Sequence, residues 1–373
     1  MSKLYWNNAA TSFPKAPGLG AHMAAVMERL PGASHRASGE ENAALDARAL
    51  LAALLGVQDK ARIVYTQNST QALNIALLGF PWKKEDVALT TAAEHNSMLR
   101  PLYALKQQGR IKDFIVLPVQ KDGRLSEATL SRAVKEHAPR LCAFLHASNV
   151  TGAINDAAAL AAVCKKAGAV TVLDASQTMG LVPVLPEAWG IDMLAVTGHK
   201  YLLGPQGTGC LYVREDIKLS PVYTGGTGIH SDSWTMPETL PLRLEAGTPN
   251  EQGMEGLAYS LQWLAAHPLD AAALDRNMAI LEEGLLSSGA VPVRVEGART
   301  PVMAFTSAMP PADMGEVLNE AYDIICRTGL HCAPLLPPYA GFDPRGSVRL
   351  SMSRFTSREE VESVVQAVKE ILA

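Results

Sequence analysis

The chain has 373 residues, 48% of them hydrophobic, which is long enough for a large core and for two domains of unequal size. It carries 33 Lys plus Arg against 37 Asp plus Glu, a net charge of -4 without a long basic run, which argues against nucleic-acid binding and a polybasic membrane patch. The opening stretch MSKLYWNNAATSFPK lacks the apolar core of a signal peptide, and no later segment is an apolar run of about 18 residues. We therefore expect a globular, cytoplasmic protein whose partners are small molecules or other proteins.

The cysteines are widely scattered and form no C-x-x-C pair. They are Cys142, Cys164, Cys210, Cys326 and Cys332. An odd number at such spacings fits neither a disulfide framework nor a zinc site. We therefore expect reduced thiols and no metal centre.

Strands and helices are predicted to alternate from about residue 61 to residue 213. Short β-branched or apolar runs predict strands at residues 62–66, 86–91, 114–119, 141–148, 170–176, 192–198 and 209–214. Helical spacing is found between them, at residues 69–79, 96–109, 126–138 and 156–168. This alternation is typical of an α/β fold with a mostly parallel sheet covered on both faces.

The remainder of the chain has a different pattern. A loop-rich segment at residues 225–253 is followed by helical stretches to about Ser288. Short strands and helices are then expected at residues 291–295, 302–306, 314–322, 347–352 and 358–372. This tail predicts a smaller α+β domain.

A lysine follows the apolar run at residues 192–196, in the segment TGHKYLLGPQGTG. Lys200 would leave a strand into a glycine-rich loop, and such a lysine can lie at the carboxyl edge of the sheet, where α/β folds bind ligands. A solvated surface lysine beside turn glycines is the alternative. Because Lys200 stands between His199 and Tyr201, the segment is not a G-x-x-x-x-G-K-[ST] phosphate loop.

Two further polar groups stand at predicted strand ends. Asp174 closes the apolar strand at residues 170–174, where a carboxylate is costly to desolvate unless a cation or strong donor faces it. Ser69 and Thr70 open the helix after the first strand, where hydroxyls and free backbone N–H groups favour an anion. Taken singly, Asp174 also fits a helix cap or turn, and the Ser69–Thr70 turn also fits ordinary N-capping.

Together, the three groups describe pyridoxal phosphate better than any other cofactor. Lys200 would hold the aldehyde as a Schiff base, Asp174 would keep the pyridine nitrogen protonated, and the Ser69–Thr70 turn would hold the phosphate. Such a cofactor activates a bound amino acid, so a nucleophilic side chain elsewhere in the chain could react with it.

The run RTGLHCAPL, from Arg327 to Leu335, supplies a thiol. Its glycine and proline argue against a regular helix or strand. A free cysteine is often a small buried hydrophobe, and that is the structural alternative. If Cys332 faces the cofactor, its thiolate could act as a nucleophile, and cationic Arg327 or His331 nearby would favour the thiolate.

These residues resemble the class V aminotransferase family, specifically the cysteine desulfurases and selenocysteine lyases. The similar motifs, in the family's order, are NNAATSFPK, AEHNS, HASNVTG, DASQ, TGHK, EAGTPN and RTGLHC. The resemblance implies the fold type I of pyridoxal-phosphate-dependent transferases. Its large, mostly parallel seven-stranded domain would span residues 15–255, and its small α+β domain residues 1–14 and 256–373. It also implies a homodimer with active sites at the subunit interface.

The resemblance further implies a role for each matching residue. Lys200 would be the cofactor lysine, Asp174 the pyridinium partner and Gln177 a donor to the ring hydroxyl, while His95 would stack on the ring and move protons. The implied phosphate ligands are Thr70, Thr197, His199 and, from the neighbouring subunit, Thr248, in addition to Ser69 of the turn considered above. The implied substrate-binding residues are Asn149, Arg349 and Arg327, and an arginine fork suits a carboxylate.

The implied reaction converts L-cysteine to L-alanine and leaves a persulfide on Cys332, which passes sulfur to a protein or small-thiol acceptor. The short run from RTG to Cys332 resembles the SUF-type, or group II, enzymes. Selenocysteine lysis, cysteine-sulfinate desulfination, transamination and epimerase-like reactions are alternatives on the same scaffold, and a scaffold or sulfur-relay role without catalysis is another. The chain departs from the family's usual residues at Asn7, Asn96 and Leu330 and in NSTQ, which leaves the substrate preference and the acceptor open.

Overall fold

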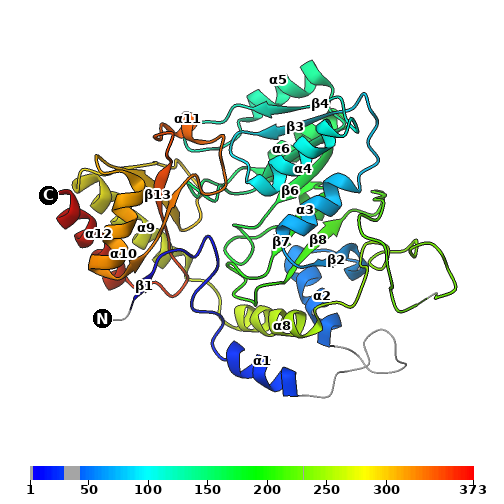
Figure 1. Ribbon diagram of the computed structural model, residues 1–373, viewed down its shortest axis with the longest axis horizontal. Helices are drawn as coiled ribbons and strands as arrows, with labels where there is room; N and C mark the ends of the chain where they lie inside the picture. Colours follow the sequence, from blue (N-terminus) through cyan, green and yellow to red (C-terminus); the bar gives the residue numbers. More distant parts are fainter. Residues whose placement is uncertain (1–2, 29–42, 230) are drawn as a thin grey trace.

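The computed structural model describes residues 3–28, 43–229 and 231–373. Two lobes stand side by side, a larger one built on a seven-stranded sheet and a smaller one that holds both the first described strand and the last helix of the chain (Figure 1). Within the described ranges, no helix is long and apolar enough to cross a membrane.

The central sheet contains all seven strands that the sequence predicts. They are β2 (Ile63–Thr66), β3 (Val87–Thr91), β4 (Asp113–Leu117), β5 (Leu141–Leu145), β6 (Val170–Asp174), β7 (Met193–Thr197) and β8 (Gly209–Val213), in the spatial order β2-β8-β7-β6-β5-β3-β4. The pairs from β7 to β4 are parallel, whereas β8 runs antiparallel to both of its neighbours. The α/β prediction with a mostly parallel sheet is therefore confirmed.

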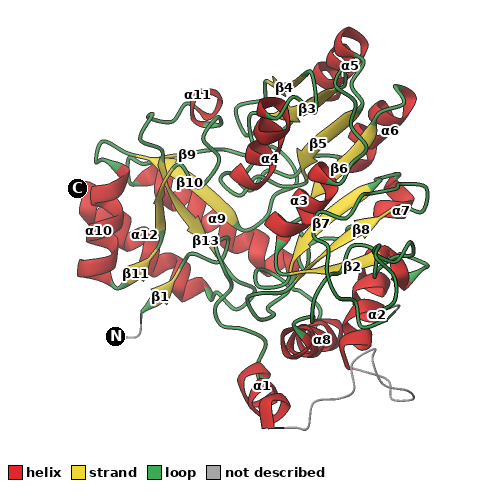
Figure 2. Ribbon diagram, turned by 45° about the vertical axis from the view of Figure 1, so that its right-hand side comes forward, coloured by secondary structure: helices red, strands yellow, loops and turns green. Residues whose placement is uncertain are grey.

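Helices cover both faces of this sheet (Figure 2). The helices of the larger lobe are α1 (Leu19–Glu28), α2 (Ala43–Leu55), α3 (Ser69–Leu78), α4 (Asn96–Gln107), α5 (Glu127–His137), α6 (Ala157–Lys166), α7 (Pro186–Trp189) and α8 (Glu251–Ala266), with a 3-10 turn at Lys60–Arg62. Alternate strand residues join two separate cores: Leu173 packs in the core with α2, α5, α6 and α8, and Val172 in the core with α3 and α4. Burial of both faces explains why β5, β7 and β8 are buried at every position.

The smaller lobe contains an antiparallel sheet in the order β12-β13-β10-β9. Its strands are β9 (Val291–Pro292), β10 (Val302–Thr306), β12 (Arg327–Gly329) and β13 (Ser347–Ser351), and its helices are α9 (Ala271–Ser287), α10 (Pro311–Tyr322), α11 (Pro337–Ala340) and α12 (Arg358–Leu372). The expectation that RTGLHCAPL contains no strand is wrong for its first three residues, because Arg327–Gly329 pairs with β13. Gly329 then adopts a φ of 96°, which suits glycine and ends the strand.

The amino-terminal segment links the two lobes. Strand β1 (Leu4–Tyr5) pairs with β11 (Ile324–Ile325) in the smaller lobe, and Ser12 then donates its backbone N–H to the carbonyl of His199 in the larger one. The division at residues 14/15 and 255/256 stays a prediction, and residues 1, 2, 29–42 and 230 lie outside the described ranges. Helix α8 crosses the second boundary and packs against α1 and α2 of the larger lobe.

Candidate active site

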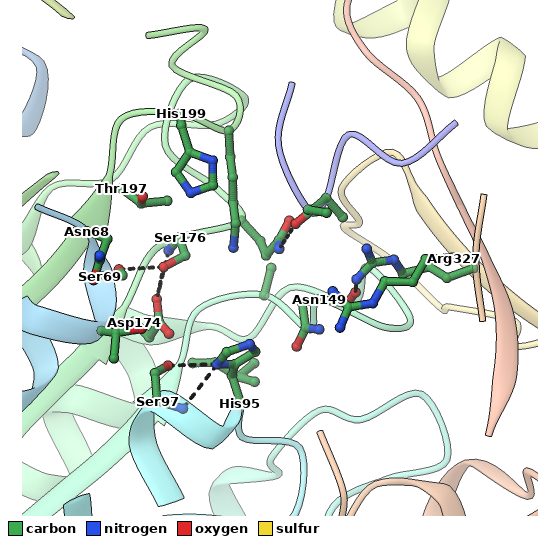
Figure 3. A pocket seen from close by; sticks show the side chains of 18 residues that line it. Asn68, Ser69, His95, Ser97, Asn149, Asp174, Ser176, Thr197, His199 and Arg327 are labelled. Atoms are coloured by element: carbon green, nitrogen blue, oxygen red, sulfur yellow. Dashed lines mark hydrogen bonds between the residues drawn. The ribbon is translucent and has the colours of Figure 1, made fainter. Parts of the chain in front are cut away.

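A cavity of about 220 Å³ lies at the carboxyl edge of the central sheet, where the smaller lobe closes over it. It is lined by Ala9, Ala10, Asn68, Ser69, Thr70, His95, Ser97, Leu145, Ala147, Asn149, Asp174, Ser176, Gln177, Thr197, His199, Lys200, Arg327 and Arg349. Figure 3 shows Asp174 and Ser176 on one side and Arg327 on the other. The edge where parallel strands end therefore gathers residues from both lobes, as α/β ligand sites do.

Lys200 lies in a tight turn directly after β7. The Gly198 N–H donates to Thr208 O at 2.8 Å, and the Leu203 N–H donates to Lys200 O at 2.9 Å. Burial, followed by the charges of Arg349 and Arg327, lowers the pKa of Lys200 to about 8, although Asp174 opposes this shift. A lowered pKa gives the amine a larger neutral fraction, which is the form that attacks an aldehyde.

Asp174 ends β6 and is held by hydroxyl groups on the cavity wall. Its Oδ1 accepts from the Ser176 N–H at 2.9 Å and from the Ser176 hydroxyl, and the Ser176 and Ser69 hydroxyls lie 2.5 Å apart (Figure 3). These bonds fix the carboxylate between the helix start and the sheet. Sequence reasoning did not single out Ser176, although it stands inside the DASQ motif.

A second carboxyl group, Glu94, is fully buried near Asp174. Its Oε1 accepts from the Thr91 hydroxyl at 2.6 Å and from the Leu145 N–H at 3.1 Å. Burial raises the pKa of Glu94 to about 8, and the charge of Asp174 adds to this shift. Glu94 is therefore mostly protonated at neutral pH.

His95 caps the start of α4 with its ring. Its Nδ1 accepts from the Ser97 N–H at 3.1 Å and lies 2.8 Å from the Ser97 hydroxyl. Burial, followed by the charge of Lys200, lowers the pKa of His95 to about 4, so the ring is neutral at pH 7. Because Nδ1 accepts a hydrogen bond, the proton of the neutral ring is on Nε2. Ser97, which sets this tautomer, also escaped sequence reasoning.

Several polar atoms of residues that line the cavity have no hydrogen-bond partner among the described residues. Thr197 Oγ1, His199 Nδ1 and Gln177 Oε1 are of this kind, while Gln177 Nε2 donates to Ala9 O at 2.9 Å. Burial, then the charges of Lys200 and Lys15, lowers the pKa of His199 to about 4. Buried polar atoms are normally satisfied, so the Thr197 hydroxyl, His199 Nδ1 and the first turn of α3 suit a polar, anionic ligand, whereas Gln177 Oε1 can only accept a hydrogen bond.

Two arginines form the opposite wall of the cavity. Arg349, only 1% exposed, donates from Nη1 to Asn149 O at 2.8 Å and from Nη2 to Asn7 Oδ1 at 2.9 Å. Its Nε and Asn149 Oδ1 have no partner in the described part of the chain. Arg327 faces Arg349 in register across β12 and β13, and burial together with this neighbour lowers the pKa of Arg349 to about 10. An added carboxylate would complete this cationic wall.

Cys332 lies beside this wall. Arg327 Nη2 is 3.1 Å from Cys332 Sγ, and Cys332 O accepts from the Asn96 N–H at 2.8 Å. The thiol is half-buried, whereas Cys142, Cys164 and Cys210 are buried. His331 is buried instead against Ser347, and burial lowers its pKa to about 3, so it is neutral and offers the thiol no cation.

Thr248 does not line this cavity and is exposed. The loop that carries it is anchored through Glu245, whose Oε1 accepts from Arg48 Nη1 at 2.9 Å and from the Tyr65 N–H at 2.5 Å. The Gly247 N–H also donates to Gly226 O at 2.8 Å. Thr248 is therefore presented outward on an anchored loop.

The residues fit pyridoxal phosphate. The helix start, Thr197 and His199 offer donors, and Asp174 offers a carboxylate on the cavity wall. Lys200 supplies an amine with a lowered pKa, and the arginine wall remains for an amino acid's carboxylate. Each chemical part of the cofactor thus has a matching group of side chains.

Known proteins resemble this chain over most of its length. The family model described as Aminotransferase class-V matches residues 4–364. A probable cysteine desulfurase of Methanothermobacter thermautotrophicus is 29% identical over 83% of this chain and 79% of its own length. The cysteine desulfurase CsdA of Escherichia coli is 32% identical over 87% of this chain and 82% of its own length. The apo structure of a cysteine desulfurase from Thermococcus onnurineus NA1 aligns with a TM-score of 0.91 at 27% identity, covering 99% of this chain and 94% of that one.

Proposed function

The chain belongs to the class-V aminotransferase family, and from this premise we propose that it is a cysteine desulfurase that uses pyridoxal phosphate and Cys332. Its fold is that of the fold type I desulfurases. One contact supports the proposed role of Cys332. Arg327 lines the cavity, and its guanidinium also touches the Cys332 sulfur. A transaminase would have no use for a thiol in this position.

The cofactor and the residues divide the chemistry between them. When bound, pyridoxal phosphate withdraws electron density from the amino acid, so that its Cα–H bond and then its Cβ–Sγ bond can break. Lys200 would hold the cofactor, and its amine, with a pKa lowered to about 8, can exchange a proton in this cavity. The Asp174 carboxylate would keep the pyridine nitrogen protonated, and Glu94 adds no competing charge because it is neutral.

Binding of the substrate falls to the arginine wall. Arg349 is already held by Asn149 O and by Asn7 Oδ1, so its guanidinium needs no rearrangement to receive the carboxylate of L-cysteine. Asn149 lies beside it, and its amide oxygen, which has no partner among the residues that the structure describes, suits the substrate's amino group or a bridging water. His95 lines the cavity and would cover the cofactor ring, and its neutral ring carries its proton on Nε2.

Cys332 then takes the sulfur. Its thiolate attacks the substrate Sγ, a new S–S bond forms, and the Cβ–Sγ bond breaks with its electron pair passing to the three-carbon fragment. The fragment takes up protons and leaves as L-alanine, while the enzyme keeps a persulfide. Arg327 stabilises the thiolate before attack through a charge-assisted hydrogen bond. An acceptor protein or a small thiol removes the outer sulfur by thiol exchange, which restores Cys332.

We also propose that the active unit is a homodimer. Thr248 stands outward on its anchored loop, and the same loop region carries the exposed aromatic side chains of Tyr223 and Trp234. These features support a site to which Thr248 of the partner contributes a phosphate contact. A reducing, cytoplasmic location is consistent with the five free cysteines of the described residues.

The proposal is tested by measuring two products in one reaction. The purified protein, saturated with pyridoxal phosphate, is incubated with L-cysteine and a thiol reductant, and alanine and sulfide are measured over time. We expect both to rise together in equal amounts. Pyruvate and ammonia in place of alanine, or alanine without sulfide, would contradict the proposed reaction.

A further inference from the structure

The carbonyl oxygen of His199, the residue before Lys200, accepts an unusual number of hydrogen bonds. The Ser12 N–H donates to it at 3.0 Å, and the hydroxyls of Ser12 and Thr11 both lie 3.1 Å from it. Lys15 Nζ donates to the same oxygen at 2.7 Å. A carbonyl oxygen has two lone pairs, and here four donors share them. These contacts hold the peptide group in a single orientation.

Lys15 is surrounded by neutral oxygens. Besides His199 O, its Nζ donates to Ser12 Oγ at 3.1 Å and to Thr11 Oγ1 at 3.2 Å. Each hydroxyl gives its own hydrogen to His199 O and offers a lone pair to Lys15, so the three N–H donors of the ammonium group all have an acceptor. Lys15 makes no ion pair with a carboxylate within residues 3–28, 43–229 and 231–373. The arrangement resembles the oxygen shell of a monovalent cation.

The amino-terminal segment holds this cluster in place from both lobes. Tyr5 OH donates to Thr11 O at 3.0 Å, and Asn8 Oδ1 accepts from the Phe13 N–H at 3.0 Å. The Ala16 N–H donates to Leu203 O, at the far end of the turn that contains Lys200. The segment therefore binds the Lys200 turn at both of its ends, and Lys15 is the charged group among these contacts.

We propose that Lys15 is a positioning residue whose ammonium group acts as a built-in monovalent cation, fixing the His199–Lys200 peptide and thereby the reach of Lys200. The inference rests on the proposed function for its effect on turnover. The cation site itself does not depend on that function. Burial lowers the pKa of Lys15 to about 8, so the ammonium form depends on the oxygens around it.

Chemical rescue tests the cation site without the cofactor. Lys15→Ala keeps the Cβ atom and removes three carbons and the ammonium group, which together match propylammonium. The thermal midpoint of the cofactor-free Lys15→Ala protein is measured against propylammonium chloride, with sodium chloride at equal ionic strength as the reference. We expect a saturable rise in this variant, because a ligand that binds the native state stabilises it. The parent protein and Lys15→Met, whose side chain fills the space, should show no such rise.

Turnover tests the positioning role. We expect Lys15→Ala and Lys15→Met to lower kcat for L-cysteine by about 10- to 100-fold with little change in KM, since small displacements of a reacting group have effects of this size. Propylammonium should restore kcat in Lys15→Ala and leave Lys15→Met unchanged. Lys15→Arg keeps a cation and should exceed Lys15→Met in kcat. The control is Lys135→Ala, at an exposed position on α5, which should match the parent.

Each outcome decides a separate point. Equal effects of propylammonium on all variants, or none on Lys15→Ala, overturn the cation site, and parental kcat in Lys15→Met overturns the positioning role. If Lys15→Ala does not fold, equal kcat values for Lys15→Met and Lys15→Arg overturn the proposal. A rescued thermal midpoint in a protein that makes no sulfide at all supports the cation site and overturns the proposed function instead.

Discussion

Replacing Glu94 by Gln should change how stability depends on pH. Glu94 is fully buried and accepts hydrogen bonds from Thr91 and Leu145 through Oε1 alone, and an amide oxygen can accept the same two bonds. The substitution therefore imitates the protonated carboxyl group and removes its titration. We expect the variant to fold with the same contacts and to keep desulfurase activity close to that of the parent at neutral pH.

The magnitude follows from the raised pKa. In the unfolded chain Glu94 titrates at its ordinary value of 4.5, and in the folded protein burial raises its pKa to about 8. Between these values the folded protein holds a proton that the unfolded chain has lost, so the stability that this group confers is complete below pH 4.5 and is lost as the pH rises toward 8. At about 1.4 kcal/mol per pH unit, the parent should lose about 3.5 kcal/mol relative to Glu94→Gln between pH 5 and pH 8.

The assay is urea unfolding of both proteins at pH 5, 6, 7 and 8 with equal cofactor, compared as the difference in free energy of unfolding. Glu85→Gln, on an exposed loop, is the control and should leave the difference unchanged over this range. If the curves for Glu94→Gln and the parent stay parallel from pH 5 to pH 8, Glu94 is already ionised in the folded state. The assignment of Glu94 as a neutral, buried carboxyl group would then be wrong.

Three further experiments test the site itself. Cys332→Ala should keep the visible absorbance of bound cofactor but lower sulfide production from L-cysteine by a factor on the order of a hundred. The loss on L-selenocysteine should be much smaller, because its carbon–selenium bond is weaker. If the variant desulfurates L-cysteine at the parental rate, Cys332 is a structural thiol. Arg349→Lys should raise KM for L-cysteine by about 10- to 100-fold, because a point charge replaces the fork, and an unchanged KM would place the carboxylate elsewhere. Mixing Lys200→Ala chains with Thr248→Ala chains should regenerate one intact site per heterodimer, and a failure to recover activity would show that the two residues serve the same chain's site.

The fold and the chemistry of the site could largely be predicted from the sequence. Lys200, Asp174 and Ser69 each follow or end a strand, and parallel strands bring their carboxyl ends to one edge, so the sequence order placed these residues together. The alternation of apolar strands and amphipathic helices predicted the mostly parallel sheet in the same way. These features could be predicted because each of them depends on residues that are close together in the sequence.

Other features depend on contacts between distant segments, and the sequence pattern did not reveal them. Lys15 meets His199 across 184 positions, and nothing in SFPK indicates that contact. Strand β12 has only three residues and exists because Arg327 pairs with Arg349 across the sheet. Ser176 and Ser97 resemble ordinary turn and cap residues until Asp174 and His95 are seen to use them. The sequence around Glu94 does not indicate that its carboxyl group is buried and protonated.

The central claim is that the substrate's sulfur passes to Cys332, and trapping the enzyme after one turnover tests it most directly. The cofactor-loaded protein is mixed with L-cysteine in the absence of reductant, alkylated, digested and examined by mass spectrometry. The account predicts one extra sulfur atom on the peptide that contains Cys332, in an amount equal to the alanine released, and none on Cys326, Cys142, Cys164 or Cys210. Alanine release with no added sulfur on Cys332, or with the sulfur on another cysteine, would contradict it.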